Sequence, residues 1–162
     1  MAVDVVARFV EGKVYALKVS QSVVERFGLQ EGKEIPMPVA LHLMYVGRAQ
    51  VFDEKGEKLS FEDLLKAVRD PDTFSVFIVL HDLARRGKSV AVDSGRELVL
   101  INENVRVYVV DEDSYLTAED LYTLVDKSIK LGYRLVIAVV DLNGEVTYYE
   151  VGKVDFPRIE RR

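Results

Sequence analysis

Residues 135–151 read LVIAVVDLNGEVTYYEV, and this stretch decides the fold. Residues 135–140 form a continuous apolar run between charged residues, which is typical of a β-strand buried on both faces. Residues 141–145 have the composition of a tight turn, because Asn143 and Gly144 tolerate a positive φ. Residues 146–151 are rich in β-branched and aromatic side chains. The stretch therefore predicts a β-hairpin.

The second strand of this hairpin carries an unusual pair of rings. Tyr148 and Tyr149 are neighbours in sequence, so a strand places one ring on each face. A strand with an aromatic side chain on both faces either lies in the centre of a sheet or packs against another chain. The second possibility fits an oligomer.

Patterns upstream of the hairpin predict a mixed sheet flanked by helices. The expected strands are residues 89–92, 97–101 and 105–110. The expected helices are residues 74–86 and 118–130. The second is capped by Thr117 and has Ile129 on its apolar face. The β-branched residues at 76, 78 and 79 leave a partly extended conformation open for the first helix.

The N-terminal half has its own alternation of strands and helices. We expect strands at residues 3–10, 13–19 and 49–52, and helices at 23–27, 36–46 and 60–68. Tyr45 belongs to the apolar face of the second helix, and Ser60 caps the third, with Asp63 three residues on. The turn Asp70-Pro71-Asp72 is the candidate linker. The predicted fold class is α/β (α+β), with a small mixed N-terminal domain at residues 1–71 and a C-terminal domain at residues 72–162 whose mixed central sheet is flanked by helices.

Composition excludes several classes of protein. The chain has 162 residues, 49% of them hydrophobic and 30% charged, as in ordinary soluble globular proteins. It lacks cysteine, which excludes disulfides, thiol catalysis and cysteine-ligated metals. We expect no membrane segment and no signal peptide, and therefore a cytoplasmic location. The net charge of −5 argues against a broad basic face that grips nucleic acid. Basic clusters at 85–88 and 158–162 are interpreted as a helix end and a solvated tail.

Motifs that carry chemistry are scarce. The two histidines, His42 and His81, both fall in predicted helices, where a structural role is the favoured interpretation. No nucleophile elbow, Walker loop or dinucleotide-binding motif occurs. Acidic residues concentrate in turns and in first helical turns, where they cap helices. The sequence thus predicts no metal site and no cofactor.

Three segments carry a likeness to a known family. They are LSFEDL at 59–64, VLHDLARRG at 79–87, and LVIAVVD at 135–141 followed by GEVTYY at 144–149. In this order and spacing they resemble the archaeal tRNA-splicing endonucleases over roughly residues 38–151, while the first forty residues match poorly. The resemblance implies a nuclease-like C-terminal domain.

The resemblance also implies a chemistry. That family cleaves pre-tRNA at bulge–helix–bulge junctions without metal, by attack of a 2′-hydroxyl that leaves a 2′,3′-cyclic phosphate, and supplies base, acid and cation as Tyr, His and Lys. Here the corresponding positions fall near Ile101, Asn102 and Tyr133, and a family arginine that grips the RNA falls at Asp126. No catalytic residue is therefore predicted in this chain.

The resemblance also implies residues that join this chain to other subunits. It implies that an acidic loop, here Asp141, Leu142, Asn143, Gly144 and Glu145, inserts into a basic pocket of a neighbouring subunit. It also implies that the final strand pairs with a partner's strand, through Val146, Tyr148, Tyr149 and Val151. We therefore expect a structural subunit in a heterotetramer with two copies of a catalytic paralogue, which meets pre-tRNA through the complex.

Two other interpretations stay open. One is an RNA-cleaving enzyme whose active site has moved, built from Tyr133, Arg134 and His81. The other is a nuclease-like fold retained as a protein-interaction module unrelated to tRNA.

Overall fold

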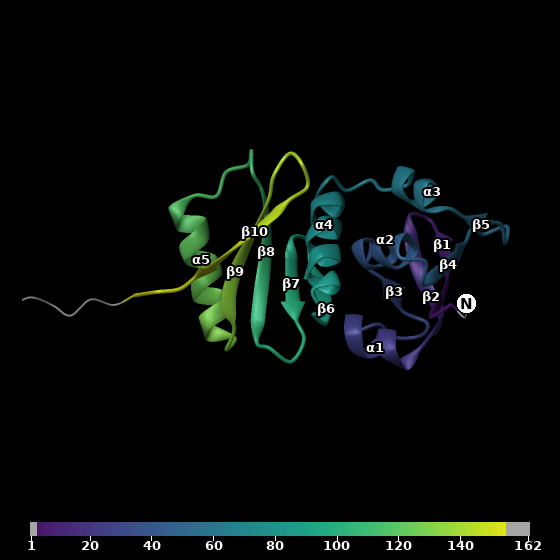
Figure 1. The fold of residues 1–162 in the computed structure, drawn as a ribbon, viewed down its shortest axis with the longest axis horizontal. Coiled ribbons are helices and arrows are strands. Elements are labelled where there is room, and N and C mark those ends of the chain that lie inside the picture. The colour runs from purple at the N-terminus through teal and green to yellow at the C-terminus, as the bar shows by residue number, and fades with distance from the viewer. Residues whose placement is uncertain (1–2, 155–162) are drawn as a thin grey trace, which may run out of the picture.

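A computed structural model of the chain describes residues 3–154, and the basic cluster at 158–162 lies outside this range. Two five-stranded mixed sheets and five helices make up the described part (Figure 1). The predicted α+β fold class is confirmed.

The first sheet has the strand order β3-β2-β1-β4-β5. Its strands are β1 (Val5–Val10), β2 (Lys13–Val19), β3 (Glu34–Ile35), β4 (Ala49–Phe52) and β5 (Lys58–Leu59). Only the pairing of β1 with β4 is parallel, so the chain must cross between them. That crossover contains β2, β3 and the helices α1 (Gln21–Phe27) and α2 (Met37–Tyr45), and α3 (Phe61–Lys66) follows β5.

The second sheet has the strand order β10-β9-β8-β7-β6. Its strands are β6 (Val90–Ser94), β7 (Glu97–Leu100), β8 (Val105–Asp111), β9 (Arg134–Val140) and β10 (Val146–Val151). The parallel pair β8–β9 is connected by α5 (Ala118–Lys130), which covers one face of the sheet. The other face packs against α4 (Asp72–Arg85).

The two sheets share the helical layer between them. In Figure 1 the order from right to left is first sheet, α2, α4, second sheet and α5. The helices α2 and α4 pack directly on each other, and one continuous apolar core includes buried residues from both sheets. Each sheet is built entirely from one side of Pro71, but the core crosses this position.

Two helix starts have the geometry that their sequences predict. The Ser60 hydroxyl accepts a hydrogen bond from the Asp63 backbone N–H at 3.1 Å, and Asp63 accepts one from the Ser60 N–H at 2.9 Å. Thr117 and Asp120 form the same reciprocal pair at the start of α5. Each capping box satisfies backbone donors that the first helical turn leaves free.

Several local expectations were wrong. The short strands β3 and β5 were not predicted, because two residues carry no readable alternation. The extended alternative for residues 76–79 is wrong, since they lie in the middle of α4, where burial is provided by α2 and the second sheet. Tyr45 and Ile129, expected on apolar helix faces, are mostly exposed.

The two histidines meet across the helical layer. His42 on α2 is 6% exposed, and its Nδ1 lies 3.0 Å from Nδ1 of His81 on α4. One ring must donate and the other accept, so the accepting ring is neutral in this arrangement. Burial, the neighbouring His81 and the guanidinium groups of Arg26 and Arg48 lower the pKa of His42 from 6.5 to about 4. The contact between the two rings, which joins α2 to α4, is consistent with a structural role for both histidines.

This contact predicts a pH-dependent stability. The folded chain keeps His42 neutral while the unfolded chain protonates it below pH 6.5, so the free energy of unfolding should fall as the pH drops from 6.5 toward 4. Urea unfolding at about pH 7 and about pH 4.5 should show a loss of about 2 kcal/mol that His42→Gln does not show, since glutamine keeps a hydrogen-bonding group without titrating. Equal losses in both proteins would contradict the assignment.

Candidate functional site

The loop between β9 and β10 is shaped by its first residue. Oδ1 of Asp141 accepts hydrogen bonds from the backbone N–H groups of Asn143 and Glu145, each at 2.9 Å. The Asp141 N–H donates to the Glu145 carbonyl at 3.0 Å, and the Gly144 N–H donates to the Asp141 carbonyl at 3.1 Å. Gly144 has φ +78°, which a side chain would strain. The turn is confirmed, and the Asp141 carboxylate is part of its framework.

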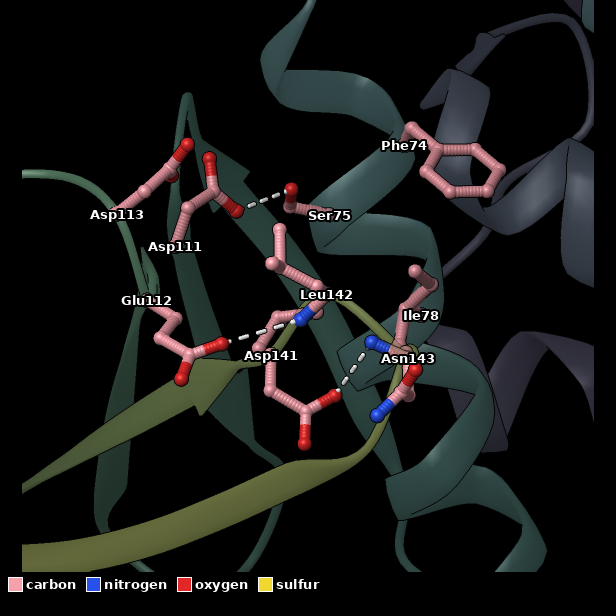
Figure 2. Close-up of a pocket in the computed structure, with 11 residues that line it drawn as sticks. Phe74, Ser75, Ile78, Asp111, Glu112, Asp113, Asp141, Leu142 and Asn143 are labelled. Atoms are coloured by element: carbon pink, nitrogen blue, oxygen red, sulfur yellow. Dashed lines mark hydrogen bonds between the residues drawn. The ribbon is translucent and has the colours of Figure 1, made fainter.

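A second acidic segment supports the loop. The Leu142 N–H donates to Oε2 of Glu112 at 3.2 Å, which ties the loop to the segment after β8 (Figure 2). The Leu142 side chain is 86% exposed at the loop tip.

A hollow of about 390 Å³ lies between this loop and α4. Its apolar wall is formed by Phe74 and Ile78, and its polar wall by residues 111–113 and the loop. Figure 2 shows the carboxylates of Asp111, Glu112 and Asp113 gathered beside the loop. The surface therefore combines exposed apolar groups with negative charge.

The carboxylates around the hollow differ in their partners. Asp111 accepts from the Ser75 hydroxyl and from Arg96 at 2.9 Å; burial acts to raise the pKa of Asp111, but these hydrogen bonds outweigh it and lower the pKa. Four others form no ion pair within residues 3–154, and we call them the acidic cluster: Glu112, Asp113, Asp141 and Glu145. The sequence showed Asp141 and Glu145 in one turn, but not that the DED run at 111–113 lies beside them.

The strand β10 is the edge of its sheet, because β9 is its only neighbour among the described strands. The alternative of a central strand is therefore wrong. Along one side, Tyr148 points toward α4, where its hydroxyl donates to Oδ2 of Asp82 at 2.6 Å. Arg86 lies over the same ring, 5.6 Å from its centre. Burial and the Asp82 carboxylate raise the pKa of Tyr148, so the hydroxyl stays protonated and holds β10 against α4.

The opposite face of β10 is more open. Tyr149 is 55% exposed there, and Val151 packs on the small apolar cluster beneath α5. Val146 packs on the main core with Tyr148. The predicted separation of the two tyrosine rings onto opposite faces is thus confirmed. Within residues 3–154 the outer backbone edge of β10 pairs with no other strand, and the Tyr149 ring beside it is exposed.

The positions that the resemblance relates to catalysis meet at one end of the second sheet, in what we call the β7–β8 corner: residues 101–104 and Tyr133. The Ile101 N–H donates to the Ser89 carbonyl at 2.8 Å, and Asn102 follows in the turn with φ +71°. The Arg134 N–H donates to the Asn104 carbonyl at 2.9 Å, which places Tyr133 next to this turn. The structure thus brings the three positions into one region.

An ion-pair network occupies this corner. Arg106 on β8 has a side chain 9% exposed, with ion pairs to Asp93 and to Glu97, the latter at 2.8 Å. The Tyr133 ring stacks on its guanidinium, 5.5 Å from the ring centre, and Lys127 pairs with Glu97 at 3.3 Å. Burial by itself lowers the pKa of Arg106, but the two carboxylates raise it, so the group stays charged. Among the described residues, both cations of this network are thus paired with carboxylates, and Lys88 pairs with Glu103 in the turn itself at 2.9 Å.

The residues of the relocated active site do not come together. His81 faces α2 on one side of the second sheet, while Tyr133 stacks on Arg106 on the α5 side. Arg134 instead pairs with Glu150 at 3.2 Å. Asp126, at the position of the RNA-gripping arginine, accepts from Lys130 and Lys153. Within residues 3–154 no three histidine or carboxylate side chains are grouped to hold a metal ion.

None of the helices in the described range has the length and apolar content that crossing a bilayer requires.

Comparison with known proteins found no matching protein-family model. The chain is 31% identical to a tRNA-splicing endonuclease of Thermococcus onnurineus (strain NA1) over 127 residues, which covers 72% of this chain and 74% of that protein. It is 29% identical to the tRNA-splicing endonucleases of Thermococcus kodakarensis and Pyrococcus horikoshii, over 72% of this chain and 75% and 74% of theirs.

The network at the β7–β8 corner predicts a structural role for Arg106. Replacing it by alanine leaves the largely buried Glu97 carboxylate, whose side chain is 13% exposed, without its main partner, and Arg106→Ala should lower the free energy of unfolding by about 3 kcal/mol. The matched control is Arg134→Ala, which breaks an exposed ion pair and should have a much smaller effect. Urea denaturation of both variants measures the difference. Wild-type stability of Arg106→Ala would instead mark Arg106 as a cation held for a ligand.

Proposed function

This chain belongs to the tRNA-splicing endonuclease family, and from that membership we propose that it works in tRNA splicing as a structural, non-catalytic subunit. It assembles with a catalytic paralogue and positions that subunit on pre-tRNA. Two copies of each chain form a heterotetramer, in which this chain provides contacts rather than chemistry.

The observation that carries the proposal is the hairpin of β9 and β10. Its second strand leaves a backbone edge unpaired within the described residues, and its loop projects an exposed leucine from an acidic surface. A backbone edge is completed by pairing with a strand of another chain. One short segment therefore offers two different contacts, which can engage two neighbours.

The acidic cluster specifies the chemistry of one neighbour. Three of its carboxylates, those of Glu112, Asp113 and Asp141, line the hollow together with Leu142 and Phe74, and Glu145 closes the loop. A partner pocket that is basic at its rim and apolar at its base would match both features. We assign Asp141 a double role, because its carboxylate shapes the loop and also contributes charge.

Edge pairing through β10 would make the second contact. Tyr148 is already held by Asp82 and cannot turn outward without breaking that hydrogen bond. Tyr149 is the ring free to cover a paired strand, together with the backbone from Val146 to Val151. Aromatic side chains are enriched at such interfaces because they bury a large area with few rotatable bonds.

The β7–β8 corner supports the non-catalytic part of the proposal. General acid–base cleavage of RNA needs groups that exchange protons near neutral pH, together with a free cation for the phosphate. Both histidines lie in the helical layer instead, and the corner's two cations are engaged with Asp93 and Glu97. Tyr133 is engaged with Arg106.

The first experiment is cleavage of a pre-tRNA that contains a bulge–helix–bulge junction. It compares the purified chain, a catalytic paralogue, and their mixture under the same conditions. We expect cleavage only in the mixture, with a rate at least several powers of ten above that of this chain alone. Cleavage by this chain alone would overturn the non-catalytic role. A chain that binds no catalytic paralogue would be an interaction module of another kind.

The second experiment tests the acidic cluster by charge removal that keeps the loop shape. Asparagine at position 141 retains an oxygen that can accept both backbone hydrogen bonds, so Asp141→Asn with Glu145→Gln removes charge but not the turn. Light scattering of the mixture should show a weaker tetramer, with a dissociation constant raised about tenfold or more.

The first sheet supplies a matched control. In the turn between β4 and β5, Oδ1 of Asp53 accepts from the N–H groups of Lys55 and Glu57, each at 2.9 Å, as Asp141 does in its own loop. The variant Asp53→Asn with Glu57→Gln changes the same chemistry away from the acidic cluster and should assemble normally. Equal assembly of both double variants would remove the docking role from Asp141 and Glu145.

A further inference from the structure

The outer face of the first sheet carries a row of side chains that crosses all five strands. Arg8 in β1 lies directly opposite Tyr15 of β2 on one side and Phe52 of β4 on the other. The same row continues to Glu34 of β3 and Lys58 of β5. Side chains paired in this way stand side by side on one face.

This face points away from the core. Val5 and Ala7 of β1 are buried beneath α2, so the alternate residues of β1, among them Arg8, point to the opposite side. The helix α2 contacts β2 and β4 from the core side. In Figure 1 it lies between the sheet and α4, and no described helix covers the other face.

The charge of this face is opposite to that of the chain. Its rows hold four cations and one carboxylate: Arg8, Lys13, Lys18, Lys58 and Glu34. None of the four cations forms an ion pair within residues 3–154. A positive surface on a chain of net charge −5 is a local feature, and it complements a polyanion.

Two aromatic rings flank the central cation. Tyr15 and Phe52 are half-buried on this face and pair with no other ring or cation among the described residues. They lie one strand to either side of Arg8, so their backbones are roughly 10 Å apart. A sheet that presents spaced rings beside free cations has what unpaired bases and their phosphates require.

We propose that this face, defined by Arg8, Tyr15, Phe52 and Lys58, binds single-stranded RNA. The rings stack on unpaired bases, and the cations contact the phosphates on either side. A duplex keeps its base faces stacked inside, so it can use the cations but not the rings. The inference goes beyond the proposed function, because it gives this chain its own contact with RNA on a surface remote from the acidic cluster.

The test uses the full chain alone, so it does not depend on assembly or cleavage. Fluorescence anisotropy measures binding of a labelled short oligouridine at low and at physiological salt. We expect Tyr15→Thr with Phe52→Thr to raise the dissociation constant about tenfold or more, because each stacked base contributes strongly to binding. Arg8→Gln should reduce the slope of the salt dependence by about 0.7 for each phosphate that the variant no longer neutralises. Threonine and glutamine suit an exposed strand surface, and circular dichroism confirms folding.

The control is a double variant with the same types of replacement at exposed positions outside this face, Tyr115→Thr with Arg134→Gln. This variant should bind oligouridine as the wild type does. The proposal is overturned by any of three results: no binding of oligouridine by the wild-type chain at low salt, equal binding by the outer-face variants, or equal loss of affinity in the control. Variants that lose affinity for a catalytic paralogue but not for RNA would show that the face binds protein. Arg8→Gln alone decides the matter if the double variant does not fold.

Discussion

The burial of α4 is the constraint on which the rest of the structure depends. The helix α2 packs on the first sheet and α4 on the second, and the contact between the two helices joins the two sheets through one core. Val76, Val79 and Leu80 are fully buried in this layer. The same helix provides Phe74 to the hollow beneath the acidic loop and Asp82 to the hydroxyl of Tyr148. The position of the hairpin is thus set by α4.

Patterns in the sequence predicted the elements whose causes are local. The apolar run at 135–140, the turn after it and both capping boxes depend on residues within a few positions of one another, and all were confirmed. The errors concern partners distant in sequence. The two-residue strands β3 and β5 exist because β2 and β4 pair with them, and the edge position of β10 depends on which strands lie beside it. Strand order is not encoded in periodicity.

In the candidate site, too, local features could be predicted and contacts between distant residues could not. The turns at 53–57 and 141–145 share the pattern Asp-x-x-Gly-Glu and nearly the same hydrogen bonds, so local chemistry cannot distinguish them. Their surroundings do, because only the second lies beside Glu112 and Asp113 and above an apolar hollow. The pairing of His42 with His81 was equally hidden, since it joins two helices distant in sequence.

The edge strand also has a consequence for the chain before it meets a partner. An unpaired backbone edge next to an exposed tyrosine is a template for pairing with any extended polypeptide, including another copy of itself. The N-terminal sheet ends in strands of only two residues, which offer little of this kind. The other edge of the second sheet, β6, is longer, but it packs beside α1 and α4. A chain whose β10 edge stays uncovered would present a border that can nucleate self-association, and this tendency would grow with the concentration of the chain.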